Sequence, residues 1–198
     1  GATSTFIASA TSYSTHGLPT IPFYIFYSMF GFQRVADLIW SAADQRARGF
    51  LMGATSGRTT LNGEGLQHQD GHSLLMAHTN PAVRAYDPSF AFELSTIIKR
   101  GIVEMSDEDV DVLYYLAVYN ENYPMPPKPE GSDEGILKGL YRLRAAPKGD
   151  GPMVRLIGSG PIMLQVLDAV EKLEAVGVRA EIWSATSYGE LRRDGMET

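Results

Sequence analysis

The hydrophobic pattern of the first half of the chain alternates between strand-like runs and helical spacing. Residues 21–27 (IPFYIFY) form a continuous apolar and aromatic run, which is typical of a strand buried on both faces of a sheet. Residues 32–46 follow with apolar side chains at helical spacing, and residues 50–52 predict a second short strand. Residues 1–15 are rich in small side chains and predict a closely packed helix.

The same order returns further along the chain. Residues 83–86 predict a strand, a helix is expected to start at residues 87–89 and to run to about Arg100, and residues 110–118 predict another strand. Strand–helix–strand, long loop, strand–helix–strand is typical of an α/β fold. We therefore expect a mostly parallel sheet with helices on both faces.

A second α/β unit is predicted towards the C-terminal end. Residues 119–133 combine prolines with acidic side chains, and residues 148–151 form a second break. Beyond these breaks the pattern predicts a strand, a helix and a strand, over residues 153–157, 161–176 and 179–183. We expect a first domain over residues 1–146 and the beginning of a second domain over residues 151–198.

Residues 53–73 (GATSGRTTLNGEGLQHQDGHS) are rich in glycine and hold almost no large apolar side chain. A loop of this length inside a compact domain is usually functional. Glu64 and His68 stand four residues apart in it, so a carboxylate and an imidazole can face one cavity. Histidine titrates near neutrality and can pass protons or bind a carboxylate substrate. The alternative is a solvated loop with two ordinary polar residues.

An aromatic pair, Tyr27 and Phe30, stands at the carboxyl end of the first predicted strand. Ligands of open α/β sheets bind outside the carboxyl ends of strands, and a flat heterocycle can stack on an aromatic ring. Taken alone, such a pair more often belongs to a hydrophobic core than to a cofactor pocket.

Three other motifs match known sites poorly. Residues 158–160 (GSG) lie between a strand and a helix, but the dinucleotide fingerprint requires glycine where Met163 stands, so a tight turn is the better interpretation. Residues 53–59 lack the lysine and the spacing of a phosphate loop. His68 and His72 have the spacing of a zinc protease, but Gln69 replaces the required glutamate. We therefore expect no metal ligand in this chain.

Composition excludes several classes of protein. The 198 residues carry a net charge of −6 and 44% hydrophobic side chains, which favours a globular protein and argues against nucleic-acid binding. The chain has no cysteine, which excludes disulfides and is compatible with the reducing cytoplasm where we expect the protein. Its first residues lack the features of a signal peptide, and we expect an internal fragment of a longer chain.

Several segments together resemble the pyruvate dehydrogenase E1 component of the homodimeric type, within the transketolase-like superfamily. The segments that carry this resemblance are IPFYIFYSMFGFQR (21–34), ARGFLMGATSGRTTLNGEGLQHQDGHS (47–73), YDPSFAFEL (86–94), NENYPMPPKPEG (120–131), GLYRLRA (139–145), VRLIGSGPI (154–162) and SATSYGELRRDG (184–195). They span nearly the whole chain. Residues 1–146 resemble the pyrimidine-binding domain of that family, and residues 151–198 resemble the start of its C-terminal domain.

The resemblance implies a cofactor and roles for particular residues. The family binds thiamine diphosphate with Mg²⁺ between two domains. Phe30 would stack on the aminopyrimidine ring, and Arg34, one turn later, is also expected to face the cofactor. Tyr27 and His68 would reach the substrate, with Glu64 supporting that side of the cavity. The glutamate that activates the cofactor precedes the matched segments in the family, so we expect it, and the metal and diphosphate ligands, outside this chain.

The implied activity is that of the longer parent protein. It would be the oxidative decarboxylation of pyruvate with transfer of the acetyl group to the lipoyl domain of the acyltransferase component (E2), carried out by a homodimer. The fragment is expected to be inactive alone. Two alternatives stay open, namely a transketolase-like or other 2-oxo acid enzyme that uses the same cofactor, and a non-catalytic α/β assembly module.

Overall fold

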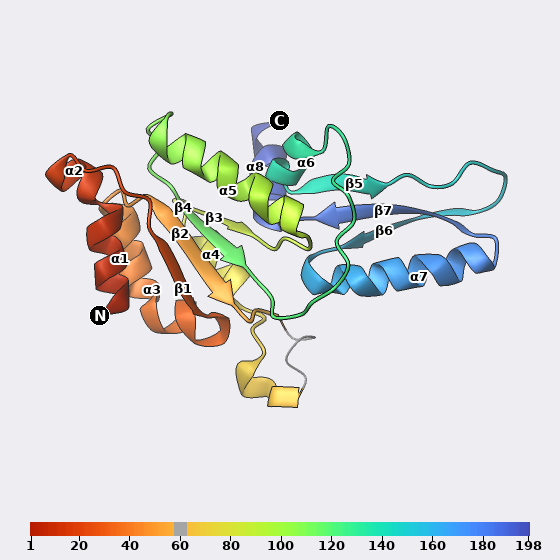
Figure 1. Cartoon of the computed structure of the whole chain (residues 1–198), viewed down its shortest axis with the longest axis horizontal. Coiled ribbons are helices and arrows are strands. Elements are labelled where there is room, and N and C mark those ends of the chain that lie inside the picture. Colours follow the sequence, from red (N-terminus) through yellow and green to blue (C-terminus); the bar gives the residue numbers. More distant parts are fainter. Residues whose placement is uncertain (58–62) are drawn as a thin grey trace.

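The computed structural model describes residues 1–57 and 63–198, which form two β-sheets with helices packed against them (Figure 1). The elements around the first sheet are α1 (Ala2–Ala10), α2 (Ser12–His16), β1 (Phe23–Tyr27), α3 (Ser28–Asp44), β2 (Gly49–Ala54), η2 (Leu66–His68), α4 (Ser73–Thr79), β3 (Val83–Tyr86), α5 (Ala91–Ser106) and β4 (Leu113–Ala117). The elements that follow are α6 (Asp133–Lys138), β5 (Leu140–Arg144), β6 (Met153–Gly158), η3 (Gly160–Ile162), α7 (Met163–Ala175), β7 (Arg179–Ala185) and α8 (Tyr188–Glu197).

The first sheet is parallel, with the strand order β1-β2-β4-β3. Its side chains alternate between two cores, as the period of a strand requires. Leu51 and Tyr115 pack with α1, α3 and α4 on one face, whereas Phe50 and Tyr114 pack with α5 on the other. Layers on both faces are the usual arrangement of a parallel sheet, and the predicted fold class is confirmed.

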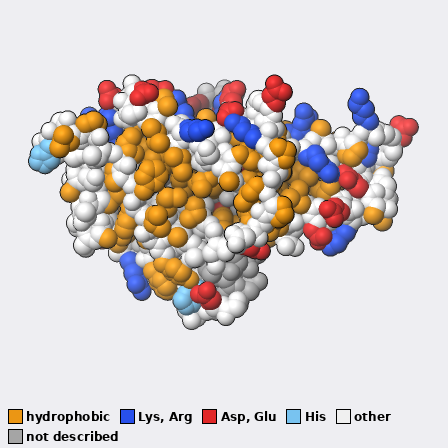
Figure 2. Space-filling view, viewed as in Figure 1, with side chains coloured by type: hydrophobic (Ala, Val, Ile, Leu, Met, Phe, Trp, Pro, Cys, Tyr) orange, Lys and Arg blue, Asp and Glu red, His pale blue; other side chains and the backbone are white. Residues whose placement is uncertain are grey.

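The first strand departs from its prediction. The run at residues 21–27 was expected to be buried on both faces, but β1 is an edge strand in which Phe23 is 47% and Ile25 is 63% exposed. Tyr24 and Phe26 alternate with them and pack on the core beneath α3. The helix α5 covers strands β2, β4 and β3, so the same face of β1 is left open in this chain. Hydrophobic side chains gather over this region of the surface (Figure 2).

The second sheet is mixed, with the order β5-β7-β6. β6 and β7 are parallel, whereas β5 runs antiparallel to β7. Val154 and Ile182 point to the face covered by α7. β5 lies before the expected boundary at residues 146–151 yet pairs within this sheet, and the domain limits stay a prediction.

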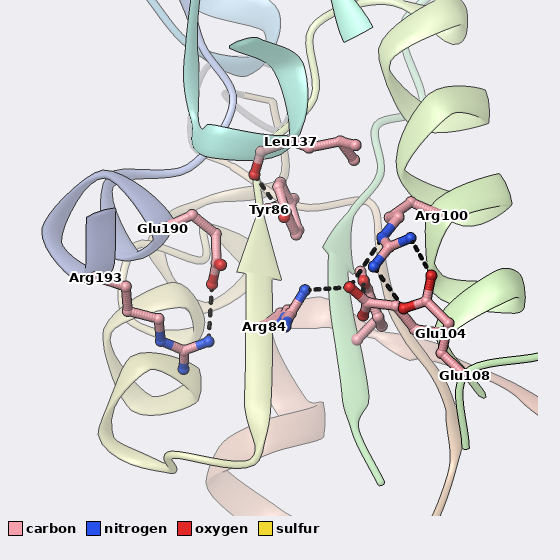
Figure 3. Close-up of polar contacts among 9 residues, drawn as sticks. Arg84, Tyr86, Arg100, Glu104, Glu108, Leu137, Glu190 and Arg193 are labelled. Carbon is pink, nitrogen blue, oxygen red and sulfur yellow. Dashed lines mark hydrogen bonds and ion pairs between the residues drawn. The ribbon is translucent and has the colours of Figure 1, made fainter. Parts of the chain in front are cut away.

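Polar side chains connect β3, the last strand of the first sheet, to helices on either side of it (Figure 3). Arg84 on β3 donates to Glu104 of α5 at 2.6 Å, and Arg193 of α8 donates to the carbonyl oxygen of Val83 at 3.0 Å. The hydroxyl of Tyr86 donates to the carbonyl oxygen of Leu137 at 2.8 Å. β3 is therefore held by α5, α6 and α8. Among the described residues, no helix has the length and apolar character needed to cross a membrane.

Candidate active site at the carboxyl edge of the first sheet

The carboxyl end of β1 turns directly into α3. Tyr27 is the last residue of the strand, and Phe30 and Arg34 follow on successive turns of the helix. The rings of Tyr27 and Phe30 stack with centroids 5.5 Å apart and planes 21° apart. The guanidinium carbon of exposed Arg34 lies 4.6 Å from the centroid of Phe30, a cation–π contact. The spacing of one helical turn therefore lines up the three predicted residues on one side of α3.

The glycine-rich loop brings the remaining predicted residues to the same place. His68, at the end of η2, places Nδ1 2.9 Å from the hydroxyl of Tyr27. Its ring meets both aromatic rings edge-on, with centroids 5.7 Å from Tyr27 and 6.0 Å from Phe30. Glu64 Oε2 lies 3.7 Å from His68 Nδ1 and 3.5 Å from the Tyr27 hydroxyl. All five residues predicted for the site thus form one contiguous group.

This group is open to solvent. The side chain of His68 is 31% exposed and that of Glu64 is 54% exposed. A phenol, an imidazole and a carboxylate within reach of one another can hold a proton, donate it or accept it. Since Nδ1 of His68 is engaged by Tyr27, Nε2 is the nitrogen that we expect to meet a ligand.

A buried carboxylate, Asp70, lies behind this group and was not predicted. Its Oδ1 accepts hydrogen bonds from the backbone N–H groups of His72 and Ser73, both at 3.0 Å, and its Oδ2 accepts one from the hydroxyl of Ser28. Burial alone would raise the pKa of Asp70, but these hydrogen bonds outweigh it and the pKa is lowered. These two backbone bonds form an Asx turn immediately before α4, a local motif that does not by itself mark a site residue.

A cavity of about 560 Å³ lies beside the group, between the first sheet and η3. Its lining includes Asp70, His72, Asp87, Tyr119 and Ser159. Tyr27, Phe30 and His68 are not part of this lining, so the predicted site residues lie on the more open surface next to the cavity.

Asp87 is the second carboxylate in the cavity wall. Burial raises its pKa to about 6, although hydrogen bonds from Tyr119 and Ser159 oppose this shift. Burial also raises the pKa of the Tyr119 phenol, and the Asp87 charge adds to that effect. Asp87 had not been predicted as a site residue, because nothing in its local sequence marks it as buried.

The weaker motifs have structural explanations where the structure describes them. Gly160 has φ +51°, and a methyl group there would lie 2.6 Å from Tyr119 Oη and 2.7 Å from Asp87 Oδ1, so GSG makes a tight turn between β6 and η3. Part of the phosphate-loop motif, Arg58 and Thr59, lies outside the described residues. Within residues 1–57 and 63–198, no three histidine or acidic side chains are placed so that they could hold a metal ion.

Comparison with protein families matches both parts of the chain. The family described as Pyruvate dehydrogenase E1 component middle domain matches residues 1–126, and the family described as Transketolase-like TK C-terminal domain matches residues 139–198. The chain is 55% identical over 197 residues to the pyruvate dehydrogenase E1 component of Pseudomonas aeruginosa, covering 99% of this chain and 22% of that protein. It is 52% identical over 199 residues to the protein of the same name from Escherichia coli K12, covering 100% of this chain and 22% of that protein. The chain thus spans about a fifth of the length of these relatives.

Solved structures show the same fold at low sequence identity. Transketolase from Campylobacter jejuni superimposes with a TM-score of 0.74 at 15% identity, over 94% of this chain and 27% of that one. Transketolase from Leishmania mexicana gives a TM-score of 0.66 at 18% identity, over 87% of this chain and 24% of that one. The arrangement of two sheets described above is therefore transketolase-like.

Proposed function

Since the chain belongs to the pyruvate dehydrogenase E1 family, we propose that it forms the half of an active site that binds the aminopyrimidine ring of thiamine diphosphate. The parent protein would decarboxylate pyruvate and pass the acetyl group to a lipoyl group of the acyltransferase component. The observation that carries this proposal is the contiguous group of Tyr27, Phe30 and His68 at the carboxyl edge of a parallel sheet.

The residues present fit the ring half of this cofactor. Phe30 is half-buried on α3, so its position is fixed while part of its ring remains accessible. Arg34 lies over that ring but is itself exposed, and a heterocycle can replace it at the loss of a contact worth about 0.5–1 kcal/mol. The described residues offer no metal cluster, and Mg²⁺ and the diphosphate would be held by other parts of the longer protein.

The chain's own side chains would orient the substrate and handle protons. When bound, thiamine diphosphate would supply a carbon nucleophile for the carbonyl group of a 2-oxo acid. His68 would present Nε2 to the substrate while Tyr27 fixes the ring through Nδ1. Glu64 would provide the opposite charge when the imidazole is protonated, since its carboxylate lies 3.7 Å from Nδ1.

Sequence identity favours this function over the transketolase alternative. The chain is 52–55% identical to the E1 components cited above, compared with 15–18% for the two transketolases. An assay of the parent protein distinguishes the two activities, because the first forms an acetyl-lipoyl group and the second transfers a ketol group.

Calorimetry tests whether half of the site lies elsewhere. We expect this chain to bind thiamine diphosphate with Mg²⁺ very weakly or not at all, and the full-length protein to bind it and to release CO₂ from pyruvate. Micromolar binding by the chain alone, about −8 kcal/mol, would contradict the division of the site. A full-length protein that binds no thiamine diphosphate would support the non-catalytic assembly module instead.

A further inference from the structure

The loop that carries Glu64 and His68 has little regular structure of its own. Between residue 63 and the start of α4, the described residues form only short 3-10 turns, at residues 63–64 and in η2. Yet His68 Nδ1 lies within hydrogen-bond distance of Tyr27, which is 41 residues away in sequence. Something must therefore fix this segment against the junction of β1 and α3.

Asp70 provides that connection. It is 5% exposed and lies two residues after His68. One carboxylate oxygen accepts the N–H groups of His72 and Ser73, which orders the end of the loop, and the other accepts the hydroxyl of Ser28. Ser28 is fully buried and stands directly after Tyr27, two residues before Phe30. One side chain therefore ties together the two segments that carry the proposed site.

Further polar contacts hold Ser28 in place. Its hydroxyl oxygen lies 3.3 Å from Tyr115 Oη, and its carbonyl oxygen accepts the hydroxyl of Ser73 at 3.3 Å. Because an ionised carboxylate can only accept, the Ser28 proton points to Asp70, and the oxygen is free to accept from Tyr115. Gly53 on β2 makes room for this arrangement, since a methyl group there would lie 2.3 Å from Tyr115 Oη.

We propose that Asp70 is a positioning residue, which acts through Ser28 to keep His68 against Tyr27 in the geometry that catalysis requires. The inference rests on the proposed function, because the reaction assigned to His68 is part of it. A role limited to capping α4 would affect folding alone. A positioning role affects the environment of His68 and the rate as well, because small displacements of a reacting group are costly.

Two variants of the full-length protein separate the two roles. Ser28→Ala removes the link to α3 and leaves both backbone hydrogen bonds to Asp70 in place. Asp70→Asn keeps an oxygen for those N–H groups but replaces the acceptor for Ser28 with an amide that donates. We expect each to lower kcat for pyruvate by roughly 10- to 100-fold with little change in KM. The double variant should be no worse than the more affected single variant, since both break the same link.

Histidine NMR reports on His68 without depending on activity. In selectively labelled protein, with the signal assigned from the spectrum of His68→Gln, both variants should shift the His68 ring resonance. The matched control is Asp111→Asn at the opposite edge of the sheet, where the carboxylate accepts from Arg48 and Tyr13. This variant should lower the unfolding midpoint while kcat and the His68 signal stay unchanged.

Each outcome decides between the two roles. Normal kcat and an unshifted His68 signal in both Ser28→Ala and Asp70→Asn would overturn the positioning role and leave Asp70 as a helix cap. A wild-type protein without activity on pyruvate would refute the proposed function, and the shift of the His68 signal would still report whether Asp70 positions that ring. An additive loss of rate in the double variant would show that Ser28 and Asp70 act separately, against the proposal.

Discussion

The first sheet uses charged and aromatic side chains in opposite ways at the two ends of its strands, called here the amino edge and the carboxyl edge. At the amino edge, Arg48 is 8% exposed and each of its three side-chain nitrogens donates a hydrogen bond. It donates to Asp111 Oδ1 at 2.9 Å, to the carbonyl oxygen of Met105 at 2.8 Å, and to both the side chain and the backbone of Asp109. Its guanidinium carbon also lies 3.9 Å from the ring centroid of Tyr13.

At the carboxyl edge, the charged and aromatic side chains of the predicted site are more exposed and less tightly paired than Arg48. Glu64 approaches His68 and Tyr27 only at 3.7 and 3.5 Å, and it remains largely exposed. One aromatic face of Phe30 is covered by the solvent-exposed side chain of Arg34 rather than by the core. The side chains of Glu64 and His68 can therefore still hydrogen-bond to a ligand, whereas the hydrogen bonds of Arg48 at the amino edge hold the fold together.

This difference separates polar side chains that are fully used by the fold from polar side chains that remain accessible to a ligand. A polar group that is fully paired and buried has nothing left to offer a ligand, and its loss is felt as stability. A group that is fixed by one contact and open on another side can act on a substrate. Substitutions at the two edges should therefore separate stability from rate.

The largest effect is expected for His68→Ala in the full-length protein. Turnover of pyruvate should fall roughly 10²–10⁴-fold if His68 handles a proton or the substrate carboxylate. Its ring is part-exposed and no large cavity is left behind, so the free energy of unfolding should change by less than about 1 kcal/mol. Steady-state kinetics and urea unfolding of the same preparation measure the two quantities.

Two further variants serve as a milder change at the same site and as a control outside it. Tyr27→Phe keeps the stacked ring and removes only the hydroxyl that meets His68, so its loss of rate should be milder. His78→Ala lies outside the predicted site and should be nearly silent in kinetics. Normal decarboxylation and acetyl transfer by His68→Ala would remove this residue from the active site.

The opposite pattern is expected at the amino edge for Arg48→Ala. It removes hydrogen bonds to two aspartates and two carbonyl oxygens and leaves Asp111 without its main partner. Because Asp109 is largely exposed, we expect a loss of about 2–3 kcal/mol in the free energy of unfolding, below the range for a fully buried pair. Urea unfolding measures it, and kcat per folded molecule should be unchanged. A loss of kcat with unchanged stability would contradict the division between the edges.

Much of the fold could be predicted because its signals are local. The strand at residues 83–86 was predicted with its observed limits, and the strand–turn–helix that begins at Met153 also follows from its apolar periodicity. β5 was missed, since its partner β7 lies about 40 residues later and nothing local announces the pairing. The burial of β1 was predicted wrongly for the same reason, because exposure of an edge depends on which helix covers it.

The site could be predicted only in part. The aromatic pair at the end of β1 and the Glu64–His68 spacing are visible in the sequence, and resemblance to the family joined them into one site. The structure brings them together, while their roles stay predictions. Asp70 and Asp87 could not be found in this way, because their burial arises when segments distant in sequence pack together.

The smallest expected effect concerns the cost of burying a charge at the carboxyl edge. Asp87 has a pKa raised to about 6 by burial, with the charges of Glu93 and Asp70 adding to the shift, whereas an unfolded aspartate titrates near 4. Between about pH 4 and pH 6 the native state therefore holds more protons than the unfolded state. The contribution of Asp87 to stability is fully present below about pH 4 and is lost as the pH rises through 6.

Asp87→Asn should remove this pH dependence, because the amide carries no charge at any pH. Its carbonyl oxygen can still accept from Tyr119, and the backbone bonds of residue 87 to Thr186 and Gly160 are untouched. A two-unit shift corresponds to nearly 3 kcal/mol at most, and partial exposure to the cavity reduces this to about 1–2 kcal/mol. Relative to wild type, the variant should therefore be more stable by that amount at pH 7.5 and indistinguishable at pH 4.

Urea unfolding of both proteins across this pH range measures the difference in their free energies of unfolding, in which the contributions of all other titrating groups cancel. A difference that stays constant with pH would mean that folding does not raise the pKa of Asp87, so that burying its charge at the carboxyl edge has no measurable cost.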